Sequence, residues 1–592
     1  MNSTWVGRLC GLRFSVPLML SYVIMLMAPE MVQLNTLRWW DPLVAVGSNV
    51  VLYAALAWMV CLAAALAGRW GRAVHVVAHV AVAAYAVSTL FIALLFHRHW
   101  DAFTMQFVHE TSWREAGEFA ATYIVSWRAA AVMAVAALYF VAEWWACRHM
   151  ARRRLVPRRW VARGVLAVAI AVTVGSAVFF GLDAERNYDL AARLHSPIKR
   201  NALWNMWQSC LQYGEFRAEF ARCASVQRAY RERAWCGERD ADVVFIIGES
   251  FCRHMSNLYD GRYNTNGLLL GRQRRGREAA LRGDSTVGRL YVFADAVATD
   301  NGTTQNFKYF MSTASVGQRG VAWCDRPLFP AVLRRCGYNV VFYSNQFAPN
   351  DNLGQWDASM GFVNHPGIEP YIFSHRNERK YAYDMDLVAD YAAHRRQLEA
   401  GGRNMCIFHL YGQHVNFAER YPRTFGRFTA SDVSDRYQMG HSAARLDAAQ
   451  RADVATYLNA TAYNDMVVDS IMRMFDSRNA VVVYFSDHGE EVHNFRRQYG
   501  RTDLASDCRE AMRCQLDVPL MVYLTPRYLR LHPGVDRRMA AATGRRVSTD
   551  NLPHLLFDML GVRSACYDAT RSVINARYRE PKRILLQNGR TY

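Results

Sequence analysis

The feature that most constrains this chain is a succession of five long apolar stretches within its first 183 residues. They cover residues 14–31, 43–67, 74–96, 120–146 and 165–182. Each is close to the length that an α-helix needs to cross about 30 Å of hydrocarbon. One such stretch is also typical of a buried core helix, but five in succession favour a transmembrane domain of five helices over residues 1–183.

Basic residues mark alternate connections between these stretches. Arg8 and Arg13 precede the first stretch, Arg69 and Arg72 follow the second, and an arginine-rich segment at 148–163 follows the fourth. Because Lys- and Arg-rich loops stay in the cytoplasm, we expect everything after the fifth helix to lie outside it. Membrane topology explains much of the net charge of +19, so we expect no nucleic-acid partner.

The remainder of the chain has the mixed composition of a globular domain. For residues 184–238 we predict amphipathic helices at the membrane surface, with an ordinary interdomain linker as the alternative. From 239 to 592, apolar strands at 242–248, 338–344, 405–410, 480–485 and 518–524 alternate with helical patterns. This alternation is typical of an α/β sandwich with a mostly parallel sheet.

Polar side chains follow three of the predicted strands. Glu249 follows the first, His409 and His414 end the third, and Asp487 and His488 follow the fourth. In an open α/β sheet the carboxyl ends of parallel strands form the ligand-binding edge. Each residue alone is compatible with a polar turn, but together they favour a metal site. Oxygen and nitrogen ligands without thiolate fit zinc or manganese.

A threonine opens a predicted helix between the first two strands. Counting from Thr303, apolar residues at 307, 310 and 311 form one helical face. A hydroxyl at this position lies at the positive end of the helix dipole, which favours an alkoxide and an incoming phosphate. Thr303 is therefore a candidate nucleophile, although threonine also serves as an ordinary helix cap there. Thr304 is the competing candidate, one position later.

Ten of the thirteen cysteines lie between 210 and 566, where an extracytoplasmic location would permit disulfides. The pair that we favour is Cys508–Cys514, with Cys324–Cys336 and Cys223–Cys236 as weaker alternatives. Cys406 lies within an apolar strand and is expected to be a buried thiol.

Three motifs together resemble the phosphoethanolamine transferase family of the alkaline-phosphatase/sulfatase-like superfamily, which includes enzymes that modify lipid A. They are Gly248-Glu249-Ser250, the helix-opening Thr303, and Ser486-Asp487-His488-Gly489-Glu490. Further matching segments are Arg253-His254-Met255, Tyr343-Ser344-Asn345-Gln346, Tyr463-Asn464-Asp465 and Asp517-Val518-Pro519. Five apolar spans before an outward domain also match the family architecture, so the resemblance covers nearly the whole chain.

The resemblance implies a set of site residues. The zinc ligands would be Glu249, Thr303, Asp487 and His488, with Thr303 also the nucleophile. His414, together with His409, would hold the phosphoryl group or a second zinc ion, and His493 is available for a related role.

The resemblance also implies a reaction and a location. Thr303 would attack phosphatidylethanolamine, release diacylglycerol and carry phosphoethanolamine to a lipopolysaccharide acceptor. The protein would lie in a bacterial inner membrane among its lipids, with the catalytic domain in the periplasm. A phosphoglycerol transferase of the same superfamily and a catalytically silent membrane binding module are the alternatives.

Two segments depart from the lipid A enzymes of this family. Thr299-Asp-Asn-Gly-Thr303 stands where those enzymes carry Thr-Ser-Cys-Gly-Thr, and Glu491-Val-His493-Asn is closer to the core-modifying branch. The acceptor therefore stays open between lipid A and a core sugar. Glu490 stays open between a partner of the ligands and a surface acid. A sulfatase activity is excluded because Cys324-Asp-Arg-Pro has the wrong spacing for a C-x-P-x-R nucleophile motif.

Overall fold

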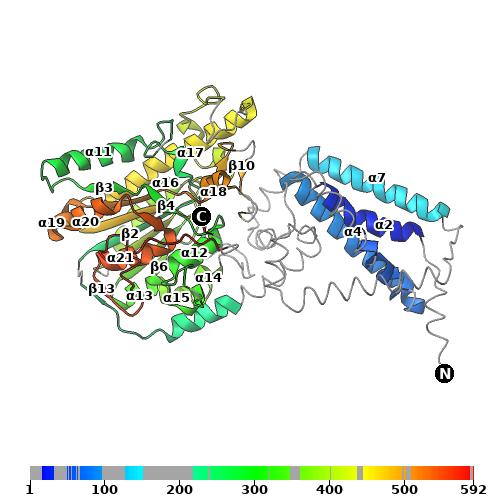
Figure 1. The fold of residues 1–592 in the computed structure, drawn as a ribbon, viewed down its shortest axis with the longest axis horizontal. Helices are drawn as coiled ribbons and strands as arrows, with labels where there is room; N and C mark the ends of the chain where they lie inside the picture. Colours follow the sequence, from blue (N-terminus) through cyan, green and yellow to red (C-terminus); the bar gives the residue numbers. More distant parts are fainter. Residues whose placement is uncertain are drawn as a thin grey trace. The chain divides into compact units, whose positions relative to one another are not determined.

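The computed structural model describes residues 16–32, 50–96, 127–150 and 218–592, apart from short gaps. The gaps are 51–52, 55, 62, 65–66, 238–239, 260, 319, 347–360, 400–401, 436–444, 496–498, 502–503, 505–507 and 587–590. The chain forms two compact units, Met1–Phe216 and Arg217–Tyr592, and Figure 1 draws both.

The first unit contains three long helices that pack against one another: α2 (Val16–Val32), α4 (Gly71–Phe96) and α7 (Trp127–Met150). A short 3₁₀ helix, η1 (Gly68–Trp70), precedes α4. Tyr22 is buried among these helices. The three helices lie within or across three of the predicted transmembrane stretches.

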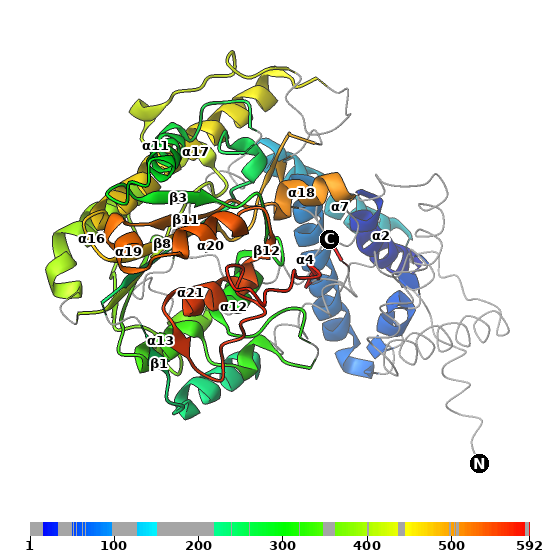
Figure 2. The same ribbon diagram turned by 60° about the vertical axis from the view of Figure 1, so that its left-hand side comes forward.

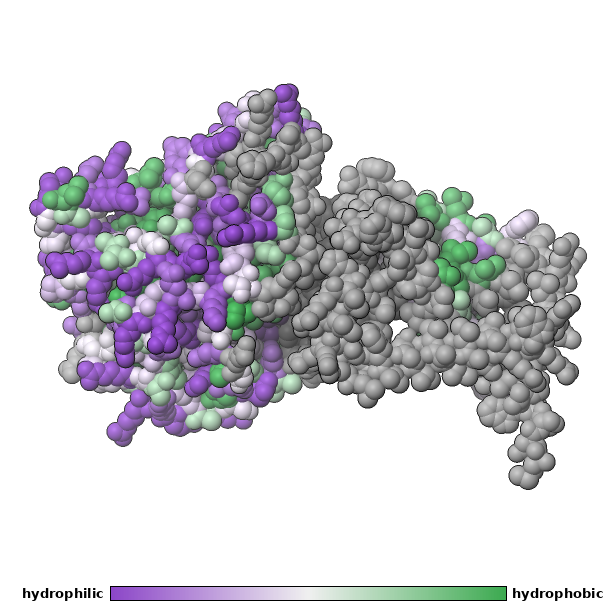
Figure 3. All heavy atoms as spheres, in the orientation of Figure 1, coloured by the Kyte–Doolittle hydropathy of each residue, from purple (hydrophilic) through white to green (hydrophobic). Residues whose placement is uncertain are grey.

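The outer surface of α4 and α7 is apolar. Val77 is 69% exposed and Leu138 is 70% exposed, and Figure 3 draws part of this apolar surface in green. Large apolar side chains on an outer surface are suited to a hydrocarbon environment. Among the described residues, one helix, Gly71–Phe91, is both long and apolar enough to cross a membrane. The stretch at 165–182 lies outside the described residues and the stretch at 43–67 is described in part, so the count of five stays a prediction.

The second unit is built on a seven-stranded sheet with the order β3-β11-β8-β2-β7-β5-β6. The strands are β3 (Arg289–Val292), β11 (Leu520–Leu524), β8 (Ala480–Ser486), β2 (Asp242–Gly248), β7 (Asn404–His409), β5 (Asn339–Ser344) and β6 (His375–Arg376). The five strands from β8 to β6 are parallel, whereas β11 is antiparallel to both of its neighbours.

The five predicted strands are confirmed as β2, β5, β7, β8 and β11, each within two residues of its expected ends. Every residue of β2 and β8 is buried, as continuous apolar runs in a parallel sheet require. The sequence analysis missed β3 and β6, which are only four and two residues long.

Helices cover both faces of the sheet (Figures 1 and 2), which gives the predicted α/β sandwich. Along β2, Phe245 packs into one hydrophobic core and its neighbours Val244 and Ile246 pack into the other, because successive side chains point to opposite faces. The core that holds Phe245 also contains side chains of α12 (Thr303–Met311), α13 (Phe329–Arg335) and α21 (Leu552–Met559). The opposite core contains side chains of α11 (Gly267–Leu281), α16 (Asp384–Leu398) and α17 (Ala448–Phe475).

Shorter elements complete the second unit. Further helices are α14 (Gly361–Asn364), α15 (Glu369–Ile372), α18 (Arg509–Leu516), α19 (Pro526–Leu531) and α20 (Val535–Ala542), and residues 218–229 are also helical. The 3₁₀ helices are η4 (Arg253–Met255), η5 (Trp323–Asp325), η6 (Phe417–Glu419), η7 (Arg423–Phe425) and η8 (Thr549–Asn551). Three strand pairs lie outside the main sheet: β1 (Trp235–Cys236) with β13 (Val562–Arg563), β4 (Asp295–Val297) with β12 (Arg546–Ser548), and β9 (Glu491–Val492) with β10 (Tyr499–Gly500).

The register of the central strands places three chain segments at one edge of the sheet. Gly248 is opposite Ser486, and Ile247 is opposite His409. The residues that follow β2, β7 and β8 therefore leave the sheet side by side.

The cysteines differ from the expected pairing. The six cysteines of the three predicted disulfides are all free thiols in the structure. Cys508 precedes α18 and is exposed, whereas Cys514 is buried inside the helix. The two cysteines are six positions apart, and a helix rises about 1.5 Å per residue, so they are separated by about 9 Å along the helix axis. This separation is too large for a disulfide. Cys406 is a buried thiol as expected, and its Sγ lies 2.9 Å from the hydroxyl of Tyr391.

This arrangement predicts different reactivities for the two thiols. Under native conditions an alkylating reagent should label Cys508 rapidly and Cys514 only after unfolding, because Cys514 is fully buried. Peptide mass spectrometry of protein labelled before and after denaturation measures the extent of alkylation at Cys508 and at Cys514. The control is Cys508→Ser, which should show no rapid labelling at position 508. A 508–514 peptide pair that stays linked without reductant would contradict the structure.

Candidate metal centre

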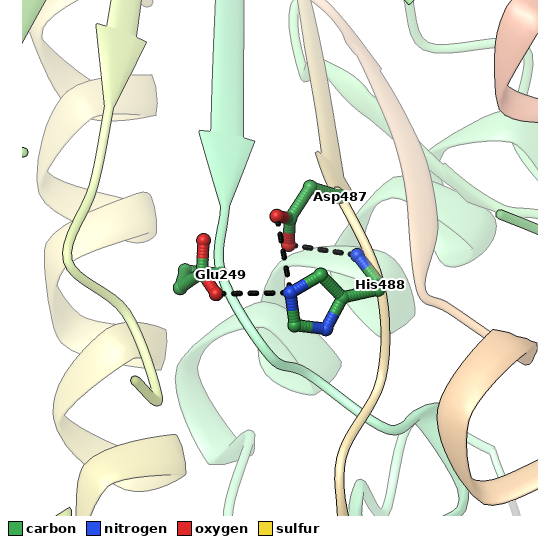
Figure 4. Close-up of side chains that lie close together, drawn as sticks. All are labelled: Glu249, Asp487 and His488. Atoms are coloured by element: carbon green, nitrogen blue, oxygen red, sulfur yellow. Dashed lines mark hydrogen bonds and ion pairs between the residues drawn. The ribbon is translucent and has the colours of Figure 1, made fainter. Parts of the chain in front are cut away.

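Three side chains that can ligate a metal converge where β2 and β8 end (Figure 4). Glu249, Asp487 and His488 are fully buried, and each offers a ligand atom within 4.8 Å of the other two. The Nε2 atom of His488 lies 3.1 Å from Oε1 of Glu249 and 3.4 Å from Oδ2 of Asp487. Burying two carboxylates together is unfavourable without a compensating positive charge, so this cluster suits a cation.

The backbone fixes the orientation of Asp487. The N–H groups of Ser250 and His488 donate to its Oδ1 atom, over 3.2 Å and 2.7 Å. No described residue donates a hydrogen bond to Oδ2, which is fully buried and directed at His488. A buried acceptor oxygen aimed into the cluster is the expected state of a metal ligand.

His488 is oriented by its own neighbour in the chain. Its Nδ1–H group donates to the carbonyl of Gly489 over 2.8 Å, which leaves Nε2 facing the two carboxylates. A backbone partner of this kind fixes the ring and its tautomer for metal binding. Glycine is required at 489 because a Cβ atom would lie 2.4 Å from the carbonyl oxygen of Cys514.

Glu249 is held from two sides. The hydroxyl of Ser250 donates to Oε1 over 2.9 Å, and the side-chain amide of Gln346 donates to Oε2 over 3.2 Å. The loop after β7 lies against its backbone, since a Cβ on Gly412 would come within 2.8 Å of the Glu249 nitrogen. Gln346 reaches the site from the end of β5, so four consecutive strands of the parallel sheet contribute to this edge.

Thr303 is the first residue of α12, and its hydroxyl faces the cluster. The Oγ1 atom lies 3.1 Å from Nε2 of His488 and 3.3 Å from Oε2 of Glu249. Thr304, the alternative nucleophile, is buried, with 2% of its surface exposed. The N-terminal N–H groups of α12 and its dipole therefore act at the position of the Thr303 hydroxyl.

Asn306 fixes the loop that leads into α12. Its Oδ1 atom accepts from the N–H groups of Thr299 and Asp300, and its Nδ2 donates to the carbonyls of Asp300 and Gly302. The sequence analysis missed this residue, because nothing in a helical pattern distinguishes an asparagine that binds the preceding loop from a solvated one.

The three additional histidines lie in different surroundings. His409 is buried, its Nδ1 atom lies 2.9 Å from the hydroxyl of Ser344, and burial lowers its pKa to about 3, so it is neutral. His414 is half-buried and its ring packs on Tyr411. His493 is turned to Asp453 on α17, with Nε2 3.0 Å from Oδ2. The structure thus brings together Glu249, Thr303, Asp487 and His488 but pairs His493 with a different acid.

The electrostatics of the cluster favour a divalent cation. Burial, and then the charge of Glu249, raise the pKa of Asp487 to about 8. Burial acts on Glu249 too, but the charges of His488, His414 and Arg501 outweigh it and hold its pKa well below the usual range. Without a metal it is therefore unfavourable for both carboxylates to ionise, and a divalent cation would allow both to do so. Two carboxylates, an imidazole and a hydroxyl are a donor set that fits zinc.

Two further residues border the cluster. Glu490 is fully buried, which excludes the surface-acid interpretation. Its Oε2 atom lies 3.6 Å from Nε of Arg501, whose Nη1 atom lies 2.9 Å from Nε2 of His488. Sequence reasoning missed Arg501, which follows β10 and lies in none of the motifs named above.

The second unit matches a known family. A family model described as Sulfatase matches residues 241–562. The chain is 24% identical over 351 residues to phosphoethanolamine transferase EptC of Escherichia coli strain K12, covering 59% of this chain and 55% of that protein. It is 27% identical over 296 residues to the Kdo(2)-lipid A phosphoethanolamine 7''-transferase of the same organism, covering 49% and 45%. The matches thus span about half the length of these relatives.

A solved structure is similar over nearly the whole chain. It is the integral membrane protein lipooligosaccharide phosphoethanolamine transferase A (EptA) from Neisseria meningitidis, with a TM-score of 0.58 and 14% identity, covering 98% of this chain and 99% of that one. At this identity the likeness shows a shared fold. The resemblance to phosphoethanolamine transferases that the sequence motifs predicted is confirmed by these relatives, and the similarity to EptC agrees with the core-modifying branch.

The cluster predicts a specific loss of metal. Asp487→Asn keeps the shape of the side chain but removes its charge, so zinc affinity should fall by more than the roughly 10- to 100-fold typical of residues that only support a ligand. Elemental analysis of the purified, dialysed protein measures the zinc content. Asp453→Asn, which alters the acid beside His493, is the matched control and should retain zinc. Full zinc occupancy in Asp487→Asn would contradict the assignment.

Proposed function

This chain belongs to the sulfatase family, and on that premise we propose that it is a zinc-dependent phosphoethanolamine transferase. The observation that carries the proposal is the hydroxyl of Thr303, which lies at the N-terminus of α12 and faces Glu249, Asp487 and His488. Relatives named as phosphoethanolamine transferases support the choice of transferred group. Zinc bound by these residues would lower the pKa of the hydroxyl and offset negative charge on the phosphoryl oxygens.

In the first half-reaction the donor is phosphatidylethanolamine. The Thr303 oxygen forms a bond to phosphorus, the bond from phosphorus to the diacylglycerol oxygen breaks, and diacylglycerol leaves with the proton lost by the threonine. Phosphoethanolamine is then covalently attached to Thr303. The N–H groups of the first turn of α12 point toward the phosphoryl group and favour its negative charge.

In the second half-reaction an acceptor oxygen of a lipopolysaccharide attacks the phosphothreonine. The bond between phosphorus and Thr303 breaks, and the threonine recovers a proton from the acceptor. The acceptor is a core sugar or lipid A, and the segment Glu491-Val-His493-Asn favours the core. His414, which adds positive charge near Glu249, is proposed to bind the phosphoryl group.

We place the protein in a bacterial inner membrane with the catalytic domain, residues 239–592, in the periplasm. Residues 1–183 form the five-helix transmembrane domain, and 184–238 connect it to the catalytic domain. Within that segment the residues from Arg217 onward belong to the second compact unit, where Phe220 and Cys223 lie in the hydrophobic core. The apolar outer surfaces of α4 and α7 and the arginine-rich connections support this placement. A donor and an acceptor that are both membrane lipids require a catalytic site close to head groups.

The nucleophile can be tested by replacing its hydroxyl alone. Thr303→Val should reduce transfer by roughly a thousand-fold or more, because no atom remains to accept the phosphoryl group. Thr303→Ser keeps the hydroxyl and should retain measurable activity. Mass spectrometry of the intact protein, incubated with phosphatidylethanolamine, should detect one added phosphoethanolamine group on the wild type and none on Thr303→Val.

The matched control is Thr304→Val, which removes the neighbouring buried hydroxyl. Activity in Thr303→Val combined with inactivity in Thr304→Val would place the nucleophile one residue later. The mass of the group added to glycolipids in cells that express the protein identifies the reaction, since phosphoglycerol and phosphoethanolamine differ in mass. Fragmentation of that glycolipid locates the acceptor, and an unchanged glycolipid profile would contradict the proposed function.

A further inference from the structure

Arg501 contributes a guanidinium group to the edge of the metal centre. Its Nη1 atom lies 2.9 Å from Nε2 of His488 and donates over 2.9 Å to the carbonyl of Asn301. Asn301 is two residues before Thr303, so the guanidinium borders both the ligand cluster and the loop that presents the nucleophile. The side chain is 14% exposed, which places a positive charge where water is largely excluded.

Two anchors hold this guanidinium apart from its contact with His488. The carbonyl of Asn301 is itself fixed, because the Asn301 side chain donates to Gln515 over 2.7 Å. On the other side, Nε of Arg501 lies 3.6 Å from Oε2 of Glu490, which is fully buried. A buried carboxylate needs a paired cation, so Glu490 and Arg501 stabilise each other in this position.

The contact with His488 would change if a metal were bound. The Nδ1–H of His488 is committed to the carbonyl of Gly489, so the neutral form of His488, which is the form that binds a metal, has a single lone pair on Nε2. That lone pair can go to a metal ion or to Arg501, but not to both. If a metal took that lone pair, Asn301 and Glu490 would still hold the guanidinium at the edge of the cluster, against the loop that leads to Thr303. An arginine has five N–H donors in one plane, so it can bind a backbone carbonyl and a phosphoryl oxygen together.

The position of His493 removes one of the competing candidates for this role. The sequence made His493 available to hold the phosphoryl group, yet its Nε2 atom is paired with Asp453 over 3.0 Å. The guanidinium of Arg501, by contrast, is close enough to His488 for direct contact. Its planar fork also matches the oxygens of a phosphoryl group better than an imidazole does.

We propose that Arg501 is a catalytic residue that binds the phosphoryl oxygens of the transferred group, and that Glu490 is the residue that positions it. The assignment deepens the proposed function and rests on it for the identity of the head group. The chemistry that Arg501 recognises is the phosphoryl group itself, whichever head group it carries.

The test uses zinc-loaded, full-length protein in detergent with inorganic phosphate as the probe. Arg501→Gln should raise the phosphate dissociation constant, measured by titration calorimetry, by about ten- to a hundred-fold, while the zinc content stays at the wild-type value. Arg501→Lys keeps the positive charge but loses the planar guanidinium. Its phosphate dissociation constant should therefore lie between those of the wild type and Arg501→Gln. Wild-type phosphate affinity in Arg501→Gln overturns the assignment, and loss of zinc from this variant also overturns it.

The matched control is Arg545→Gln. Arg545 is a partly buried arginine that donates to the backbone carbonyls of Val573 and Asn575. Its replacement should leave the phosphate affinity unchanged. An equal loss of phosphate affinity in this control would mean that Arg501→Gln weakens binding only by lowering the net positive charge of the protein. That result would overturn the assignment.

A double-mutant cycle tests the role of Glu490. Glu490→Gln alone should weaken phosphate binding and raise KM more than it lowers kcat, because the guanidinium is less well placed. In the Arg501→Gln background the same change should have no further effect on phosphate affinity. Additive effects would show that Glu490 does not act through Arg501.

The two levels of the proposal fail separately. Wild-type protein that transfers no phosphoethanolamine to a glycolipid contradicts the proposed function. The phosphate titration still decides the assignment of Arg501 in that case, because inorganic phosphate has no head group.

Discussion

The electrostatic constraint on which the second unit depends is the burial of acidic side chains around His488. Glu249 and Asp487 are fully enclosed, and the pKa of Asp487 rises to about 8 because burial and its neighbour both oppose its ionisation. Such an arrangement persists only when cations compensate it. Arg501 supplies part of that charge beside Glu490, and a divalent metal ion would supply the rest. The polar contacts of the site hold these groups where the positive and negative charges can compensate each other.

The parallel sheet makes the arrangement possible. The register that pairs Gly248 with Ser486 brings the residues after β2 and β8 together, although more than 200 positions separate them in the sequence. The helix that begins at Thr303 then packs its apolar face on the sheet and points its N-terminus at the same edge. A rigid core thereby holds a hydroxyl and three candidate ligands in place, and the backbone N–H groups of Ser250 and His488 fix the orientation of Asp487.

Much of the fold was predictable from the sequence, because strands buried on both faces leave uninterrupted apolar runs. The five long strands and the layered sandwich follow from such runs, whereas β3 and β6 are too short to leave one. The predicted disulfide at Cys508 was wrong for a local reason. Proximity in sequence suggested a short bridge, but the helix between the two cysteines holds them apart.

The sequence by itself determined the ligand types and their placement at strand ends, because Glu249, Asp487 and His488 each follow an apolar run directly. Only the tertiary structure decided which other charged groups join them. Arg501 lies in no regular pattern, and its approach to His488 depends on the path of the chain after β9 and β10. Likewise, His493 and His488 are equivalent candidates by residue type, but the backbone directs one to Asp453 and the other to the two buried carboxylates. Residue type fixes which chemistry is possible, and only side-chain direction in the folded chain fixes which groups meet.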